Sequence, residues 1–273
     1  MNAKLQEKYN NLKRIIEENG KDGVIIAFSG GVDSSTLTKI SWDILGDKAI
    51  AVSGISDTYS QEELAESRKI AKEIGIKHQF VTTCETEKQE FIQNPENRCY
   101  YCKGELLDVL INLADKIGFK TVFEGTNASD LEGHRPGYKA IKERNRVISP
   151  WVEAGITKEE IREIAEEFHL SFYDKPASPC LASRVPFGER ITKERLNRIE
   201  KAESAIKNIT GIREIRVRDH GTIARIEVPK DDRYKLVAES IIDNIVARLK
   251  GLGYKYVTMD LEGFRSGSML EGL

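Results

Sequence analysis

A glycine-rich segment near the N-terminus has the residue types of a phosphate-binding loop. Ser29-Gly30-Gly31-Val32-Asp33-Ser34-Ser35 follows the apolar run Val24-Ile25-Ile26-Ala27-Phe28 and precedes apolar residues at helical spacing. Glycine lets the backbone turn tightly and approach a ligand, and the start of a helix adds unpaired N–H donors. The Gly-Lys-Ser/Thr ending of a Walker A loop is absent. A plain tight turn is the alternative. We predict that this loop binds nucleotide phosphates through Ser29, Gly30, Gly31, Asp33, Ser34 and Ser35.

A second polar segment, Gly125-Thr126-Asn127-Ala128-Ser129-Asp130, follows another predicted strand. The carboxyl ends of parallel strands meet at one edge of a sheet, so Gly125, Asn127 and Asp130 are expected beside the glycine-rich loop. Asp33 and Asp130 are candidates to hold Mg²⁺ against the phosphates, because Mg²⁺ takes few carboxylates and keeps phosphate oxygens as ligands. The alternative is that the polar residues of this segment only close a turn.

Three of the four cysteines have a spacing that suits metal or thiol chemistry. Cys99 and Cys102 form a Cys-x-x-Cys pair, and Cys180 lies in a distant proline-bearing loop. A structural zinc site takes four protein ligands, and its fourth would be His134 or Cys84, although Cys84 is expected to pack as a small hydrophobe after a strand. Three thiolates suit a [4Fe–4S] cluster with one open iron, which we favour. Thioredoxin-like exchange between Cys99 and Cys102 is the remaining alternative.

Arginines alternate with apolar residues near the end of the chain. In Arg213-Glu214-Ile215-Arg216-Val217-Arg218 the alternation puts Arg216 and Arg218 on one face of a strand, and the next strand, Ile223–Val228, carries Arg225 and Glu227 in the same way. Guanidinium groups two residues apart can hold a phosphate by paired hydrogen bonds. The alternative is a solvated sheet face with cross-strand ion pairs, which contribute little.

Short apolar segments alternate with amphipathic segments over the first half of the chain, and these must position the candidate residues. The predicted strands are Val24–Phe28, Ala49–Ser53, His78–Thr82, Thr121–Glu124 and Arg146–Ile148. The predicted helices are Leu64–Ile74, Leu106–Ile117 and Ile161–Phe168, the first and third opened by capping boxes of Ser60 with Glu63 and Thr157 with Glu160. This order predicts an α/β fold with a parallel sheet covered on both faces.

The last third of the chain predicts a smaller α+β domain. Asp174–Arg190 contains three prolines, which predict a long ordered loop or linker in place of a helix. After it come a helix over Thr192–Ile209, two strands, a helix over Asp232–Leu252 and a final strand. We therefore expect a nucleotide-binding domain over residues 1–175 and a linker with a substrate-binding or oligomerisation domain over residues 176–273.

The composition of the chain is typical of a class of protein but does not indicate a function. The chain has 273 residues, 40% of them hydrophobic and 32% charged, as in ordinary soluble proteins. A net charge of −2 gives no overall attraction to nucleic acid, which argues against a nucleic-acid partner. The N-terminal residues show no apolar signal core, and no apolar run has the length of a membrane span. We expect a cytoplasmic protein with no membrane partner.

The residues together resemble a known family. The glycine-rich loop is similar to the PP-loop of the ATP pyrophosphatases, whose domain has an adenine nucleotide α-hydrolase-like fold. Over the whole chain the sequence resembles the LarE family of ATP-dependent sulfur transferases. The further motifs of this resemblance are Arg135-Pro136-Gly137, Ser183-Arg184-Val185-Pro186-Phe187-Gly188, Arg216-Val217-Arg218, Ala224-Arg225-Ile226-Glu227, Tyr256-Val257-Thr258-Met259-Asp260-Leu261 and Gly263-Phe264-Arg265-Ser266-Gly267.

The resemblance implies an activity and a set of site residues. Family members adenylate a carboxyl group of a pyridinium dicarboxylate mononucleotide in nickel-pincer nucleotide biosynthesis and replace an oxygen with sulfur, releasing AMP and pyrophosphate. Arg216 and Arg218, with Arg184, would hold the substrate phosphate, and Glu203 and Glu227 fall where acidic site residues are expected. The resemblance also implies a homo-oligomer and a supply of sulfide or a sulfur-donor protein.

The cysteines distinguish two branches of this family. Members with one active cysteine near the position of Cys180 give up its sulfur, whereas three cysteines resemble the branch that carries a [4Fe–4S] cluster, with Cys99, Cys102 and Cys180 as catalytic ligands. The same cysteine pattern occurs in PP-loop enzymes that thiolate tRNA, so tRNA thiolation is the alternative function. A non-catalytic ATP- or metal-binding regulator is a third hypothesis.

Overall fold

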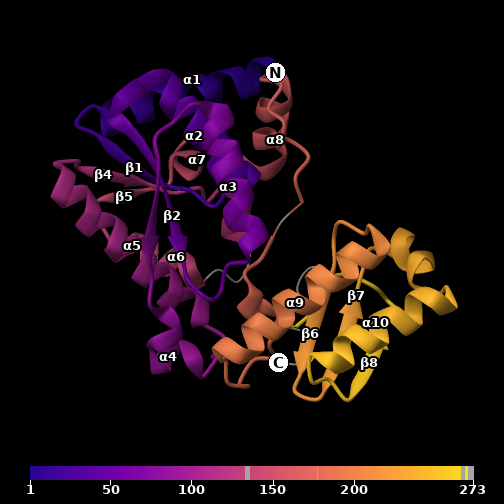
Figure 1. Ribbon diagram of the computed structural model, residues 1–273. Coiled ribbons are helices and arrows are strands. Elements are labelled where there is room, and N and C mark those ends of the chain that lie inside the picture. Colours follow the sequence, from indigo (N-terminus) through magenta and orange to yellow (C-terminus); the bar gives the residue numbers. More distant parts are fainter. Residues whose placement is uncertain (133–135, 177, 266–267, 270–273) are drawn as a thin grey trace. The chain divides into compact units, whose positions relative to one another are not determined.

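The chain folds into two compact units, each described here by itself. The structure is a computed structural model that describes residues 1–132, 136–176, 178–265 and 268–269 (Figure 1). Unit 1 comprises Met1–Glu85 and Asn97–Ser178, and unit 2 comprises Thr86–Glu96 and Pro179–Leu273. The segment Thr86–Glu96, which the sequence analysis assigned to the first domain, therefore belongs to the second unit.

Unit 1 is built on a five-stranded parallel sheet. The strands are β1 (Val24–Ala27), β2 (Ala49–Ile55), β3 (His78–Thr82), β4 (Thr121–Phe123) and β5 (Val147–Ile148). Their order in the sheet is β3-β2-β1-β4-β5, with Val24 of β1 paired to Ala49 of β2 and to Thr121 of β4. The expected α/β fold class with a parallel sheet is confirmed, and each predicted strand is present within two residues of its expected ends.

Helices cover both faces of this sheet. The helices of unit 1 are α1 (Ala3–Gly20), α2 (Val32–Leu45), α3 (Gln61–Ile74), α5 (Arg98–Ile117), α6 (Pro136–Lys142), α7 (Pro150–Glu153) and α8 (Lys158–Glu167). Val24 and Ile26 of β1 pack in the core that contains α1, α2, α3, α7 and α8. Ile25 and Ala27 alternate with them and pack against α5 and α6 on the other face (Figure 1). Short 3₁₀ turns lie at Gly46–Lys48 (η1), Glu85–Glu87 (η2) and Ala128–Glu132 (η3).

In unit 1 the starts of α3 and α8 agree with the prediction, α5 begins earlier than predicted, and α1, α6 and α7 were not predicted. Both predicted capping boxes form, at Ser60 with Glu63 and at Thr157 with Glu160. Helix α5 begins at Arg98, eight residues before the predicted start, so that the Cys-x-x-Cys pair lies in its first turns. Helix α1 was not predicted, although its buried residues recur at helical spacing.

Unit 2 contains a three-stranded mixed sheet packed against two long helices. Its elements are α4 (Gln89–Ile92), η4 (Leu181–Arg184), α9 (Lys193–Thr210), β6 (Arg216–His220), β7 (Ile223–Glu227), η5 (Lys230–Leu236), α10 (Glu239–Gly251) and β8 (Tyr256–Met259). Strand β7 pairs antiparallel with β6 and parallel with β8. Apolar residues of β6, β7, α9 and α10 form the core of this unit. The α+β character predicted for the second domain is confirmed.

One predicted helix of unit 2 was wrong in its extent. Asp232–Leu252 was expected to be one helix, but it is divided into η5 and α10. Ala238 between them has an extended backbone, with ψ at 133°, and therefore interrupts helical hydrogen bonding. The predicted loop Asp174–Arg190 contains only the short turn η4 within its described residues.

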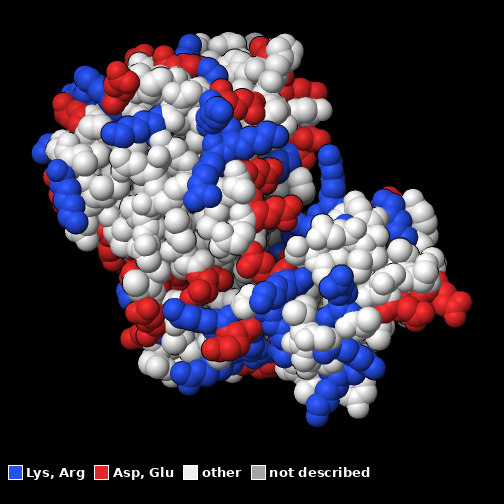
Figure 2. Space-filling model, in the orientation of Figure 1, with Lys and Arg blue, Asp and Glu red and all other residues white. Residues whose placement is uncertain are grey.

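Across the part of the chain that the structure describes, no helix combines the length and apolar character needed to span a bilayer. On the face shown in Figure 2, Lys and Arg side chains are interspersed with Asp and Glu side chains.

Candidate nucleotide site and arginine cluster

The glycine-rich loop connects the carboxyl end of β1 to the first turn of α2. Gly30 has a φ of +71°, which favours glycine, and a Cβ at this position would lie 3.1 Å from the Cα of Ser67 on α3. Gly31 is the N-cap of α2. Ser34 Oγ lies 3.0 Å from Ser29 Oγ and donates to the Gly31 carbonyl at 3.1 Å. The loop is thus a compact turn whose helix start presents N–H groups to an anion.

The second predicted segment lies directly behind this loop. A Cβ on Gly125 would lie 3.1 Å from the backbone nitrogen of Ser34, a tighter contact than most Cβ atoms make, so glycine favours this close approach. Asn127 and Asp130 bond each other, each backbone N–H donating to the other's side chain at 3.2 Å. The two segments are therefore brought together as expected, and the turn that was considered as an alternative role for Asn127 and Asp130 is present as well.

Asp33 has the environment of a metal ligand. Its Oδ2 is paired with the ammonium group of Lys158, at the start of α8, and its carbonyl accepts from the Trp151 indole at 3.1 Å. Within the described residues no hydrogen-bond partner reaches its buried Oδ1. Burial raises the pKa of Asp33, and the charge of Asp130 acts in the same direction, although Lys158 opposes both. An orphaned carboxylate oxygen in a phosphate-binding loop fits Mg²⁺.

Two lysines of this site were missed by the sequence analysis. Lys158 contacts Asp33, and Lys175 donates to the carbonyl of Gly30 at 2.7 Å. Lys158 directly follows Thr157, the N-cap of α8, but no local pattern indicated that α8 begins beside the loop.

The cysteines occupy both units. Cys99 and Cys102 are three residues apart in the first turns of α5, so they share one helix face, Cys99 exposed and Cys102 half-buried. Cys180, also half-buried, directly precedes η4 in unit 2. The described residues contain no group of three or more His, Cys, Asp or Glu side chains placed to hold a metal ion. The convergence of the three thiols therefore stays a prediction, although two cysteines at this spacing that form no disulfide fit two ligands of a metal cluster.

The expected burial of Cys84 was wrong. Cys84 lies beyond the end of β3 and is exposed, because the strand ends at Thr82 and the chain then leaves the sheet. His134 and Arg135, with Ser266 and Gly267 of the last motif, lie outside the described residues.

A buried carboxylate connects α5 to the second nucleotide segment. Glu124 accepts hydrogen bonds from Lys103 Nζ at 2.9 Å, from Thr126 Oγ1 at 2.7 Å and from Ser149 Oγ. Burial alone would raise its pKa, but Lys103 and the two hydroxyls outweigh burial and lower the pKa of Glu124. Glu124 is thus held as a carboxylate directly before Gly125.

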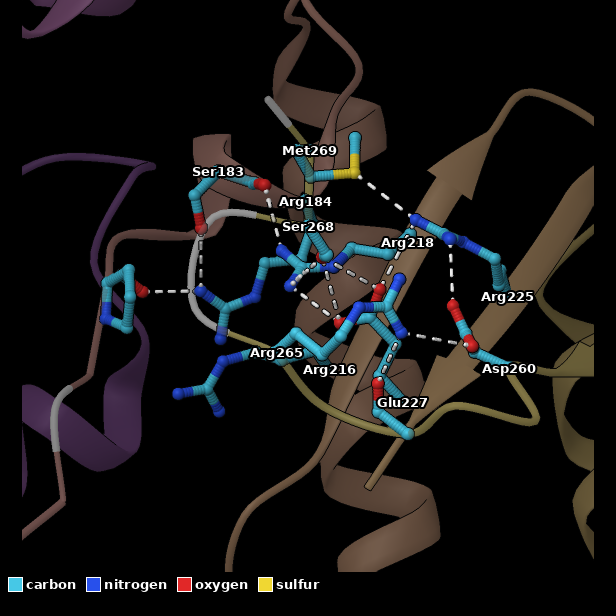
Figure 3. A network of polar contacts seen from close by, with 12 residues as sticks. Ser183, Arg184, Arg216, Arg218, Arg225, Glu227, Asp260, Arg265, Ser268 and Met269 are labelled. Atoms are coloured by element: carbon cyan, nitrogen blue, oxygen red, sulfur yellow. Dashed lines mark hydrogen bonds and ion pairs between the residues drawn. The ribbon is translucent and has the colours of Figure 1, made fainter. Parts of the chain in front are cut away.

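The arginines of unit 2 form a buried cluster (Figure 3). Arg216 of β6 pairs in register with Glu227 of β7, and Arg218 pairs with Arg225, so the predicted alternation is confirmed. Arg216 and Arg218 are each only 5% exposed and Glu227 is fully buried. The alternative was therefore wrong about solvation of this face, whereas the cross-strand ion pair that it included is present between Arg218 and Glu227.

Both predicted acidic residues pair with arginine, Glu203 with Arg184 and Glu227 with Arg218 and Arg225. Arg218 Nη2 lies 2.7 Å from Glu227, and Arg184 donates to both carboxylate oxygens of Glu203, at 2.8 and 3.0 Å. Glu203 also accepts from the backbone N–H of Val217 at 2.9 Å and so fastens α9 to β6. Arg184 donates further to the carbonyl of Cys180 at 3.1 Å. The same guanidinium group thus links the Cys180 backbone to the arginine cluster.

The surroundings of Arg216 disfavour its positive charge. Burial lowers the pKa of Arg216, and the charge of Arg184 lowers it further. The Arg216 guanidinium group stacks over Phe264 at 5.2 Å from the ring centre. Arg225 pairs with Asp260 at 2.9 Å, and Ser268 lies between Arg218 and Glu227 (Figure 3). A phosphate would relieve the mutual repulsion of the buried guanidinium groups.

Comparison with known proteins supports one family over most of the chain. The family described as NAD synthase matches residues 4–98, which include the glycine-rich loop. The chain is 41% identical to the uncharacterized protein slr1717 of Synechocystis sp., over 97% of both chains. It is 33% identical to the pyridinium-3,5-bisthiocarboxylic acid mononucleotide synthase of Lactiplantibacillus plantarum, over 92% of this chain and 90% of the relative. It is also 33% identical to the uncharacterized protein MJ0830 of Methanocaldococcus jannaschii, over 96% and 94%.

Proposed function

The chain belongs to the LarE family of ATP-dependent sulfur transferases, and we propose that it converts a carboxylate of a pyridinium dicarboxylate mononucleotide into a thiocarboxylate. The family places the enzyme in nickel-pincer nucleotide synthesis. The observation on which the proposal rests is the glycine-rich loop at the sheet edge, which contains Asp33 and lies so close to Gly125 that a Cβ on Gly125 would be 3.1 Å from the Ser34 nitrogen. This arrangement suits a triphosphate whose α-phosphate is attacked by an acid group.

The reaction consists of two substitutions. A carboxylate oxygen of the substrate attacks the α-phosphorus of ATP, and the bond from that phosphorus to the bridging oxygen breaks, so pyrophosphate leaves with the electron pair. Sulfide sulfur then attacks the acyl carbon, and the bond from that carbon to the AMP oxygen breaks. Adenylation is needed because a carboxylate is a poor electrophile until its oxygen becomes part of a good leaving group.

In unit 1 the nucleotide would be bound by Ser29, Gly30, Gly31, Ser34 and Ser35 of the loop and by Gly125 and Asn127 of the second segment. Backbone N–H groups at the start of α2 would stabilise charge on the departing pyrophosphate. Asp33, through its orphaned Oδ1, and Asp130 would hold Mg²⁺. Mg²⁺, when bound, would neutralise phosphate charge.

In unit 2 the phosphate of the mononucleotide would be held by Arg216 and Arg218, with Arg184 beside them. Glu203 and Glu227 orient Arg184 and Arg218, respectively, through the buried ion pairs described above. A planar guanidinium group fixed in this way loses little side-chain freedom when it binds phosphate, which favours affinity and a defined substrate orientation.

Cys99, Cys102 and Cys180 would hold a [4Fe–4S] cluster as their thiolates. The absence of a disulfide at these cysteines and the helical spacing of the first two support this assignment. When bound, the cluster would supply sulfur as a deprotonated nucleophile at neutral pH. Sulfide or a sulfur-donor protein would replace the sulfur consumed in each cycle. We further propose a cytoplasmic homo-oligomer.

The proposal is tested by incubating anaerobically purified protein with ATP, Mg²⁺, sulfide and pyridinium dicarboxylate mononucleotide. We expect AMP and pyrophosphate in equal amounts and a product whose mass reports replacement of oxygen by sulfur. Pyrophosphate without thiocarboxylate would contradict sulfur transfer, and thiolation of tRNA in place of the mononucleotide would favour the alternative function. Absence of pyrophosphate with either substrate would contradict the enzyme assignment.

A further inference from the structure

We infer that Lys175 is a positioning residue that sets the orientation of the Gly30–Gly31 peptide, and with it a phosphate-binding N–H group of the loop. The inference rests on the proposed nucleotide site. It concerns a residue far from the loop in sequence, which composition and motif spacing did not single out.

The Lys175 ammonium group is held against the loop. Its Nζ donates to the carbonyl oxygen of Gly30 at 2.7 Å and lies 2.7 Å from a carboxylate oxygen of Glu66 on α3. The Lys175 side chain is only 13% exposed, whereas Glu66 is 43% exposed. The bond to Gly30 is therefore the less solvated of the two, and a charged donor makes it stronger than a neutral hydrogen bond.

Planarity of the peptide bond transmits this contact to the next residue. In a trans peptide the carbonyl of one residue and the N–H of the next point in opposite directions. A fixed Gly30 carbonyl therefore directs the N–H of Gly31 to the other side of the loop, where it donates a long hydrogen bond to Ser29 Oγ, at 3.3 Å and exposed. In the proposed site, a phosphate at the start of α2 would take this exposed N–H from Ser29 Oγ.

The loop needs such a restraint because of its two glycines. Gly30 already has a positive φ, and neither residue has a Cβ that limits rotation of the peptide between them. Without the Lys175 contact, that peptide can rotate at little steric cost and present its carbonyl oxygen to a phosphate. Such an orientation would repel an anion.

Arg162 of α8 fixes the backbone that carries Lys175. Its Nη1 donates to the carbonyl of Tyr173 at 2.7 Å, and its Nη2 donates to the carbonyl of Lys175 itself at 2.7 Å. One rigid guanidinium group thus holds two carbonyls on either side of Asp174. Arg162, Lys175 and Gly30 form a continuous chain of contacts within unit 1.

The test compares two probes that differ in phosphate. Binding of pyrophosphate and of adenosine is measured by calorimetry for the wild type, Lys175→Met and Lys175→Arg. We expect Lys175→Met to weaken pyrophosphate binding at least tenfold and to leave adenosine binding unchanged, and Lys175→Arg to restore part of the loss. Lys48→Met is the matched control, because Lys48 also donates to a backbone carbonyl, that of Lys21 at 2.8 Å, away from the loop.

A second readout follows the peptide directly. In protein labelled with ¹⁵N-glycine, Lys175→Met should shift the amide signal of Gly31 and leave that of Gly253, in unit 2, unchanged. Unaltered pyrophosphate binding, or equal loss of pyrophosphate and adenosine binding, would overturn the inference. If the wild type binds neither probe nor ATP, the proposed nucleotide site fails together with the inference, and this result is distinct from a selective effect of the variant.

Discussion

The ammonium group of Lys103 lies 2.9 Å from a carboxylate oxygen of Glu124, which is almost completely buried. Lys103 directly follows Cys102 in α5, and Glu124 directly precedes Gly125 behind the nucleotide loop. The pair therefore joins the first turns of α5, which carry Cys99 and Cys102, to the segment that packs against the glycine-rich loop. If α5 or the segment at Gly125 moved, the buried Glu124 carboxylate would lose the Lys103 ammonium group, and the free energy of that loss opposes the movement.

Substitution of Lys103 should destabilise the protein more than substitution of Glu124. Lys103→Met leaves a buried carboxylate and should lower the free energy of unfolding by about 2 kcal/mol. Glu124→Gln should cost less, because the amide can still bond Thr126 and Ser149. Urea unfolding of both variants and the double variant measures the coupling, with Lys39→Met at an exposed pair as control. Additive effects of the two substitutions would contradict the proposed link.

The cysteine assignment predicts a brown protein. Anaerobically purified wild type should contain about four iron and about four labile sulfide ions per chain, and Cys99→Ala, Cys102→Ala and Cys180→Ala should each lose most of them. Cys84→Ala is the matched control, an exposed thiol expected to have no effect. Metal analysis and the visible spectrum measure the outcome.

Cys180→Ala should also abolish sulfur transfer but spare pyrophosphate formation, because the nucleotide loop is in unit 1. A colourless zinc protein would refute the cluster. Dehydroalanine at Cys180 after turnover, detected by intact mass, would instead assign the protein to the branch that sacrifices a cysteine.

Arg216→Lys should weaken substrate binding more than turnover. Lysine cannot reproduce the paired hydrogen bonds of guanidinium or its stacking on Phe264, so we expect KM for the mononucleotide to rise by about tenfold to a hundredfold with a smaller change in kcat. KM for ATP should be unchanged. Arg233→Lys, at an exposed position of η5, serves as control. Equal changes of KM for both substrates would argue against a phosphate site in unit 2.

Asp33→Asn should remove the magnesium dependence of nucleotide binding. Amide oxygen is a weaker Mg²⁺ ligand than carboxylate, so calorimetry should show at least tenfold weaker binding of ATP with Mg²⁺ and little change without it. Asp43→Asn on the same helix, at an exposed pair with Lys39, should behave as wild type. Because burial raises the pKa of Asp33, its metal binding should be lost at a higher pH than for an ordinary aspartate as pH falls.

The lowered pKa of His78 leads us to expect that the folded protein loses stability in acid. Burial, followed by the charge of Arg68, lowers the pKa of His78 from 6.5 to about 4, and its ring lies 2.8 Å from Ser53 Oγ. The unfolded state binds the proton more tightly, so the stability from neutral His78 is fully present above about pH 6.5 and is lost as pH falls towards about 4.

Because the His78 ring is only partly buried, we expect a loss of about 1 to 2 kcal/mol over this window. Urea unfolding at several pH values should show a smaller decline for His78→Gln than for the wild type. Parallel curves for the two proteins would show that His78 is not the responsible group.

Local patterns in the sequence were sufficient to predict the parallel sheet, the helices with capping boxes and the glycine-rich loop. Each of these depends on neighbouring residues: a run such as Val24–Ala27 buries both of its faces, Ser60 with Glu63 satisfies the N–H groups of its own helix turn, and Gly30 supplies a positive φ. The alternation of Arg216 and Arg218 was local too, so their common face was predicted correctly.

Tertiary structure decided which partners these residues meet. Lys158 and Lys175 reach the loop from more than a hundred residues away, because α8 and the segment after it pack on the helices that flank β1. The burial of Arg218 against Glu227 and of Arg184 against Glu203 likewise depends on how β6, β7 and α9 fold over one another. The sequence by itself determined the phosphate loop and the sheet that carries it, since these follow from short-range pattern. The contacts that neutralise and orient its charges required the packed chain, because a buried charge is stabilised only by the partner that folding brings to it.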